Sequence, residues 1–135
     1  MLKRIHHVAI VVEDIQSVLG FWREALGLEL AHSEHVPEQE AQIACFPTGE
    51  SEIELVEPTS DMSGMARYLA KRGPGMHHIC FEVDNLTEVL SVLKAQGIRL
   101  IDETPRLGGG GKRIAFIHPE STHGVLVELC ELASS

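Results

Sequence analysis

Two histidine pairs and two isolated glutamates are the residues of this sequence best suited to chemistry. The His-His pairs occupy positions 6–7 and 77–78, and they repeat at an offset of 71 residues. Glu54 and Glu128 each lie in an otherwise apolar segment, at an offset of 74 residues. A charged side chain in such a segment needs a partner or a metal ion. Each half of the chain therefore offers an imidazole and a carboxylate at nearly matching places.

Two imidazoles and two carboxylates form a ligand set for one divalent ion. Zn, Co, Ni, Mn and Fe(II) all accept such ligands. We therefore predict a single metal ion that takes one His and one Glu from each half of the chain. Successive residues of a strand point to opposite faces. The spacing alone thus leaves open which His of each pair is the ligand.

The histidines belong to a longer internal repeat. Residues 5–15 align with residues 76–86 at the same offset of 71. In each copy a capping residue, Asp14 or Asn85, precedes apolar residues at helical spacing and then a glycine, which predicts a helix. The apolar positions, which we expect to be buried, are Ile15, Val18, Leu19, Trp22 and Leu26 before Gly27, and Leu86, Val89, Leu90 and Leu93 before Gly97.

Three short segments of strand character follow each predicted helix, so each half reads β-α-β-β-β. These segments are residues 28–34, 40–46 and 51–57, and then residues 98–103, 113–117 and 124–131. We predict an α+β fold of two paired βαβββ modules, whose curled mixed sheet surrounds a metal-binding cleft. The modules are residues 1–58 and 76–135, joined by a linker with a short helix at residues 59–75.

Composition limits the class of protein. Apolar residues make up 44% of the 135 residues, yet no apolar run approaches the ~20 residues of a membrane span, and the chain does not open with a signal-peptide pattern. We therefore predict a cytoplasmic protein. The net charge of −9 disfavours nucleic acid as a partner. Cys45, Cys80 and Cys130 lie in apolar runs without paired spacing, which indicates buried thiols.

Several of these segments resemble the vicinal oxygen chelate superfamily, also called the glyoxalase/bleomycin resistance/dioxygenase superfamily. The most similar members are the methylmalonyl-CoA epimerases, and the resemblance covers nearly the whole chain. It is carried by Ile5-His6-His7-Val8-Ala9, by Ile53-Glu54-Leu55-Val56, by residues 75–84 and, most specifically, by residues 107–119 continuing to 124–129. The resemblance implies His7, Glu54, His78 and Glu128 as the metal ligands.

The same resemblance implies an activity. It is the interconversion of (R)- and (S)-methylmalonyl-CoA, by removal of the proton alpha to the thioester through a metal-stabilised enolate. The implied cofactor is one divalent ion (Co, Zn, Ni or Mn), and the family commonly forms homodimers. Inversion needs a base on each side of the planar intermediate, and Glu128 and Glu54 are the candidates. The glycine run at 108–111 with Lys112 and Arg113 is a weaker candidate for binding CoA phosphates.

One departure from the family pattern concerns the second base. Some epimerases are proposed to use a second glutamate on the third strand, whereas the matching positions here are Gln42 and Ile43. Metal-bound Glu54 is the leading candidate for the second base in its place.

Three other functions are compatible with parts of the pattern. A glyoxalase I-type lactoylglutathione lyase would use the same ligands and the same proton transfer. An Fe(II) dioxygenase would use two His and one carboxylate, but a second carboxylate leaves fewer open positions on the metal. A metal-free binding protein would not need the His and Glu set at all.

Overall fold

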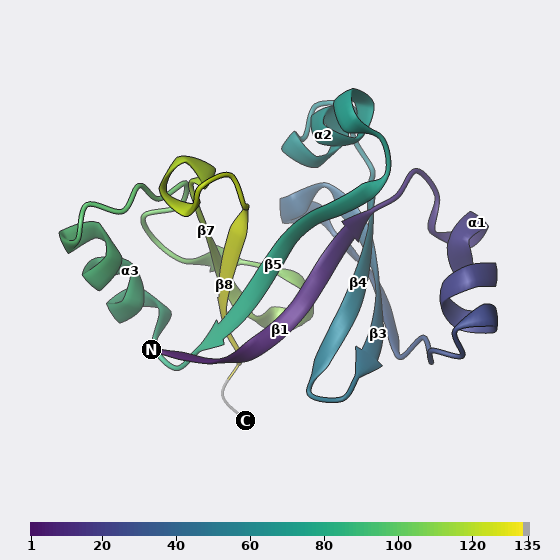
Figure 1. The fold of residues 1–135 in the computed structure, drawn as a ribbon, viewed down its shortest axis with the longest axis horizontal. Helices are drawn as coiled ribbons and strands as arrows, with labels where there is room; N and C mark the ends of the chain where they lie inside the picture. Colours follow the sequence, from purple (N-terminus) through teal and green to yellow (C-terminus); the bar gives the residue numbers. More distant parts are fainter. Residues whose placement is uncertain (134–135) are drawn as a thin grey trace. The chain divides into compact units, whose positions relative to one another are not determined.

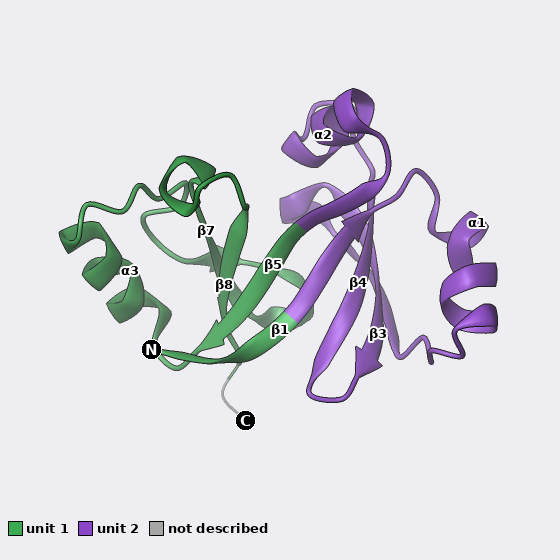
Figure 2. Ribbon diagram, in the orientation of Figure 1, with its two compact units in different colours: residues 1–6, 78–135 green, residues 7–77 purple. Residues whose placement is uncertain are grey.

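The computed structural model describes residues 1–133, which form an α+β fold as predicted (Figure 1). Eight strands are hydrogen-bonded in the order β2-β3-β4-β1-β5-β8-β7-β6, and the sheet is mixed. Two compact units are present: residues 7–77, and residues 1–6 with 78–135 (Figure 2). Strands β1 (Leu2–Val11) and β5 (Gly75–Val83) each contribute residues to both units. Within residues 1–133, no helix has the length and apolar character needed to cross a membrane.

The unit of residues 7–77 contains the first β-α-β-β-β repeat. After β1 come helix α1 (Ile15–Leu19), the π-helix η1 (Gly20–Ala25), β2 (His32–Val36), a short 3-10 turn (Pro37–Gln39), β3 (Ala41–Thr48), β4 (Ser51–Pro58) and helix α2 (Gly64–Arg72). Strand β4 pairs in parallel with β1 and antiparallel with β3. One face of this sheet packs against α1, where Ile15 and Leu19 meet Phe46 and Leu55. Helix α2 lies in the predicted linker.

The second unit repeats this order. Helix α3 (Leu86–Ala95) follows β5, and then come β6 (Arg106–Leu107), the 3-10 turn η3 (Gly109–Gly111), β7 (Arg113–Ile117), the 3-10 turn η4 (Pro119–Thr122) and β8 (Val127–Glu131). Strand β8 pairs in parallel with β5 and antiparallel with β7. Leu86 and Leu90 of α3 pack on one face of this sheet, against Ala115 and Leu129.

Two of the six predicted strand segments are displaced. Residues 28–34 were expected to pair, but β2 begins only at His32, and within residues 98–103 the structure has a single bridge, from Leu100 to Ile117. Leu28 and Leu30 pack against the α1 core, and Ile98 and Leu100 pack against the α3 core. Their apolar character reflects burial rather than strand pairing, and sequence alternation cannot separate the two.

The apolar face predicted for the first helix is wrong at its end, because Leu26 is 52% exposed. The chain changes at Gly20 from an α-helix to a π-helix, in which the amide of Leu26 donates to the carbonyl of Phe21. A π-helical turn holds more residues than an α-helical one. Positions counted at the α-helical period therefore rotate away from the core.

The helix caps differ between the repeats. The Asn85 side chain accepts a hydrogen bond from the Glu88 amide, as predicted, but Asp14 makes no side-chain cap. Instead, Glu57 at the end of β4 accepts a hydrogen bond from the Ile15 amide at 2.8 Å. Glu131 at the end of β8 accepts one from the Leu86 amide, also at 2.8 Å. In both units a carboxylate of the last strand thus caps the helix that covers its sheet.

We expect Glu57→Ala to lower the free energy of unfolding by about 1 kcal/mol, the usual effect of losing an N-terminal cap. Glu29→Ala is the matched control, because it removes the same charge from an exposed position of the same unit. Chemical denaturation of both variants measures the difference. Equal stabilities of the two would show that the cap contributes nothing.

The first residues of β1 are held to β5 by a buried carboxylate. Arg4 Nε donates to Glu82 Oε1 at 2.6 Å, Lys3 Nζ lies 3.2 Å from Glu82 Oε2, and the Glu82 side chain is 7% exposed. The hydrogen bond from Arg4 is the main reason that the pKa of Glu82 lies below its ordinary value of 4.5, and Lys3 adds to the lowering. The ionised form of Glu82 therefore stabilises the fold.

A lowered pKa in the folded state gives a stability contribution that is complete above the unfolded pKa and is lost as the pH falls through the folded pKa. We expect Glu82→Gln to be less stable than the unmodified protein at pH 7, by about 1–2 kcal/mol. Below pH 4 the difference should shrink. Melting temperatures measured from pH 7 to pH 3 test this, and a difference that is constant with pH would contradict it.

Candidate metal centre

His7 and Glu54, two predicted ligands, form a buried pair in the unit of residues 7–77. Strands β1 and β4 run in parallel, and Ala9 lies opposite Glu54. His7 is two residues before Ala9, so its side chain is on the same face as that of Glu54. His7 is 1% exposed and Glu54 is 5% exposed. His7 Nε2 lies 3.7 Å from Glu54 Oε2.

The other unit repeats this arrangement with His78 and Glu128. Strands β5 and β8 run in parallel, and Cys80, two residues after His78, lies opposite Glu128. Both side chains are buried, and His78 Nε2 lies 3.1 Å from Glu128 Oε1. The register of each Glu relative to its His is therefore identical in the two units. The unequal sequence offsets of 71 and 74 residues arise elsewhere in the repeat.

Glu54 carries an unsatisfied buried atom. Its Oε2 is inaccessible to solvent and has no hydrogen-bond partner within residues 1–133. A buried carboxylate oxygen without a partner is costly, and a cation is the partner that removes the cost. The donor chemistry of His7 and Glu54 thus fits a divalent ion, and that of His78 and Glu128 is the same.

Aromatic packing orients the second imidazole. The Phe116 ring lies 5.2 Å from the His78 ring, at an interplanar angle of 87°. Phe116 is opposite Glu128 in the pairing of β7 with β8. One phenylalanine therefore contacts His78 and sits beside the carboxylate that His78 faces.

The three cysteines are buried and form no disulfide, as predicted. Cys45 lies opposite Glu54 in the pairing of β3 with β4, and its sulfur, an oxygen of Glu52 and an oxygen of Glu54 lie within 4.8 Å of one another. Sequence analysis missed this neighbour of Glu54. The signal was the two-residue turn at Gly49 and Glu50, because the register counted back from that turn places Cys45 opposite Glu54.

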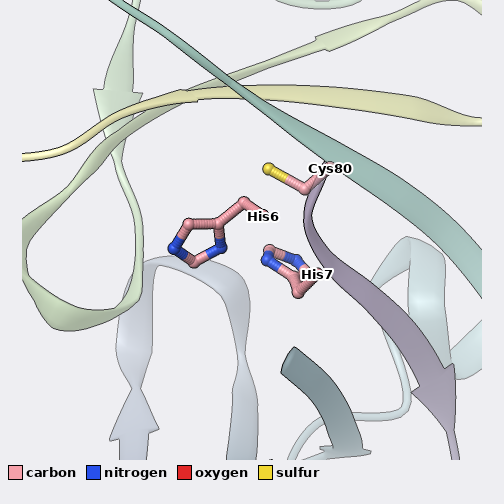
Figure 3. A group of neighbouring side chains, drawn as sticks. All are labelled: His6, His7 and Cys80. Atoms are coloured by element: carbon pink, nitrogen blue, oxygen red, sulfur yellow. The ribbon is translucent and has the colours of Figure 1, made fainter. Parts of the chain in front are cut away.

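Figure 3 shows Cys80 close to His6, which belongs to the same unit. A ring nitrogen of His6 and the Cys80 sulfur lie within 4.8 Å of each other. Burial raises the pKa of the Cys80 thiol far above its ordinary value of 9.0, and the neighbouring Cys130 and Glu128 add to the rise. Without a metal ion, Cys80 is therefore a protonated thiol rather than a thiolate.

Lys112 and Arg113, the predicted contacts for CoA phosphates, differ in burial. Lys112 is buried, and its Nζ donates to the carbonyl of Gly109 at 2.8 Å, within the glycine turn. Arg113 is exposed, with Nη2 3.5 Å from Thr87 Oγ1 and Nη1 3.7 Å from Glu131 Oε2. Phosphate binding by these two residues stays a prediction.

Comparison with known proteins shows which family this chain resembles. The model of the Glyoxalase/Bleomycin resistance protein/Dioxygenase superfamily matches residues 6–116. The uncharacterized protein YqjC of Bacillus subtilis is 44% identical over 130 residues, which cover 96% of this chain and 93% of that protein. The mitochondrial methylmalonyl-CoA epimerase of Homo sapiens is 37% identical over 129 residues, which cover 95% of this chain and 73% of that protein.

A solved structure of a methylmalonyl-CoA epimerase in complex with methylmalonyl-CoA and NH4+ is also similar. It superposes with a TM-score of 0.93 at 35% identity, over 99% of this chain and 97% of that chain.

Because Glu54 is buried beside His7, we expect a divalent ion to raise the melting temperature of the metal-free protein. At an ion concentration about 1,000 times the Kd, the gain is about 4 kcal/mol, or roughly 15 °C for a chain of this size. Glu54→Gln removes the buried charge. Without metal, this variant should have a higher melting temperature than the unmodified protein. Added metal should raise its melting temperature by less.

Thermal unfolding with and without Zn²⁺ or Co²⁺ measures both effects. Glu38→Gln, at an exposed position of the same unit, is the control for the change of charge. The metal assignment fails if the ions leave the melting temperature unchanged, or if Glu54→Gln and Glu38→Gln respond to them equally.

Proposed function

This chain belongs to the Glyoxalase/Bleomycin resistance protein/Dioxygenase superfamily, and we propose that it is a metal-dependent methylmalonyl-CoA epimerase. The reaction interconverts (R)- and (S)-methylmalonyl-CoA. The observation that carries the proposal is the repeated His and Glu pair, buried at the same register in both units. The similarity to epimerases over almost the entire chain supports this choice among the activities of the superfamily.

In this proposal His7, Glu54, His78 and Glu128 hold one divalent ion, with Co, Zn, Ni and Mn as the candidates. When bound, such an ion is a Lewis acid that stabilises negative charge developing on the thioester oxygen. The unsatisfied Oε2 of Glu54 and the proximity of His78 to Glu128 support this ligand set.

The two glutamates are also the proposed proton carriers. The substrate carbon that inverts lies between the thioester and the carboxylate, and it carries one proton. One glutamate removes that proton, and the electron pair left on the carbon delocalises into the thioester carbonyl. The other glutamate, in its protonated form, then delivers a proton to the opposite face. The cycle exchanges the protonation states of Glu54 and Glu128, and exchange with solvent resets them.

The proposal extends to the setting of the protein. We expect a cytoplasmic homodimer that acts on a soluble acyl-CoA. The molar mass from light scattering tests the dimer.

The overall activity is tested by a coupled assay with each enantiomer of methylmalonyl-CoA and metal-loaded protein. We expect interconversion of the two enantiomers, and no product from methylglyoxal with glutathione. The reverse result would favour the lactoylglutathione lyase alternative.

Removing one of the two bases should separate proton exchange from inversion. We expect Glu128→Gln and Glu54→Gln each to slow epimerisation by about 10²- to 10⁴-fold. Exchange with deuterated water should continue for the enantiomer whose proton faces the remaining glutamate. The measurement follows exchange and epimerisation separately for each enantiomer, with metal content as the control, since Gln can still bind the ion.

Epimerisation by Glu54→Gln at the unmodified rate would contradict a base role for Glu54. The next candidate would be Glu40, an exposed residue with a left-handed backbone (φ 52°) immediately before β3.

A further inference from the structure

Arg106 lies on the same face of its sheet as the metal-ligand candidate Glu128. It is in β6, opposite Ile114 of β7. Side chains of directly paired residues share a face, and so do residues two apart along a strand. Ile114 therefore shares its face with Phe116, and Phe116 lies opposite Glu128. Arg106 is thus placed on the face of the sheet that carries the proposed chemistry.

Two contacts fix the arginine. Asp102 Oδ1 accepts a hydrogen bond from Arg106 Nε at 3.2 Å, while Asp102 Oδ2 accepts one from the Phe116 amide at 2.8 Å. The guanidinium carbon lies 5.6 Å from the centroid of the Phe116 ring. The same ring packs edge-to-face against His78. One aromatic ring therefore separates the Arg106 guanidinium from a proposed metal ligand.

The anchored guanidinium still has hydrogen-bond donors to offer. Only its Nε is engaged, and the two terminal nitrogens have no hydrogen-bond partner in the described part of the chain. The side chain is 40% exposed. A guanidinium held at Nε presents its remaining N–H groups as a planar fork, which matches the two oxygens of a carboxylate.

We propose that Arg106 binds the free carboxylate of the substrate's malonyl group and so selects malonyl-type thioesters over uncharged acyl thioesters. The inference rests on the proposed function. The phosphates of CoA are separated from the thioester by the whole pantetheine arm, whereas Arg106 is one ring away from His78. A carboxylate has lone pairs enough to accept from a guanidinium and to bind a metal ion at the same time.

The neighbouring cations are less suited to this role. Arg113 occupies the position of β7 that faces Thr87, on the side of helix α3. The ammonium group of Lys112 is buried and donates to the Gly109 carbonyl.

The test compares three ligands on metal-loaded protein by calorimetry: malonyl-CoA, malonyl-pantetheine, which lacks the phosphates, and propionyl-CoA, which lacks the carboxylate. We expect Arg106→Gln to weaken binding of both malonyl thioesters by about tenfold to a hundredfold. Binding of propionyl-CoA should change by less than about twofold. Arg106→Lys keeps the charge but loses the planar fork of donors. Its affinity for the malonyl thioesters should lie between those of the unmodified protein and Arg106→Gln.

Arg99→Gln is the matched control, because Arg99 is an exposed arginine of the same unit whose guanidinium pairs with Glu120. It should bind all three ligands as the unmodified protein does. Metal content and melting temperature establish whether the variants are folded. If Arg106→Gln does not fold, the comparison is made with Arg106→Lys instead.

Three results would overturn the assignment: no loss of binding in Arg106→Gln, an equal loss for propionyl-CoA, or a loss for malonyl-CoA that malonyl-pantetheine does not show. The last would assign Arg106 to a phosphate. Failure of the proposed function looks different, because then the unmodified protein itself neither epimerises methylmalonyl-CoA nor binds malonyl thioesters.

Discussion

The burial of a carboxylate beside an imidazole, once in each unit, is the constraint on which the rest of the structure depends. Glu54 and Glu128 are almost fully removed from solvent, and each faces a histidine of the neighbouring parallel strand. Taking such charges out of water is costly unless the surrounding protein or an ion compensates them. The unsatisfied oxygen of Glu54 shows that hydrogen bonds from the described residues leave part of this cost in place. The divalent cation that we propose would supply the missing compensation.

The last strand of each unit places a functional glutamate on each face of its sheet. In β4, Glu54 points to the face that carries His7, and Glu57, three residues later, points to the opposite face and caps α1. Strand β8 repeats this division with Glu128 and Glu131. The odd spacing of the two carboxylates places the proposed ligand and the helix cap on opposite faces. The helix that covers one face of the sheet is therefore anchored by the strand that positions the proposed ligand on the other face.

Much of this architecture could be predicted from the sequence because the repeat is explicit. The two His motifs fixed the strand that opens each module, and the helix and last strand of each repeat lie where the pattern predicts. The apolar setting of Glu54 and Glu128 correctly indicated burial. The combination of both pairs around one ion remains a proposal, because local patterns contain no information on how two units meet.

What the sequence pattern missed has physical causes. Within the two displaced segments, Leu28, Leu30, Ile98 and Leu100 are apolar because they pack against the helix cores. Periodicity does not distinguish such packing from strand pairing. The exposure of Leu26 follows from a π-helical turn, which the local sequence pattern did not predict. The capping of α1 by Glu57 joins residues 42 positions apart, so it could be recognised only once β4 was placed beside β1.

The central claim is that the two His and Glu pairs bind one metal ion, and X-ray absorption spectroscopy of the zinc-loaded protein tests it most directly. One zinc per chain is expected, with only nitrogen and oxygen ligands at about 2.0–2.2 Å and a scattering signature of two imidazoles. A sulfur ligand at about 2.3 Å would instead implicate a buried cysteine such as Cys45. That result, or a spectrum with a single imidazole, would contradict a site formed by both His and Glu pairs.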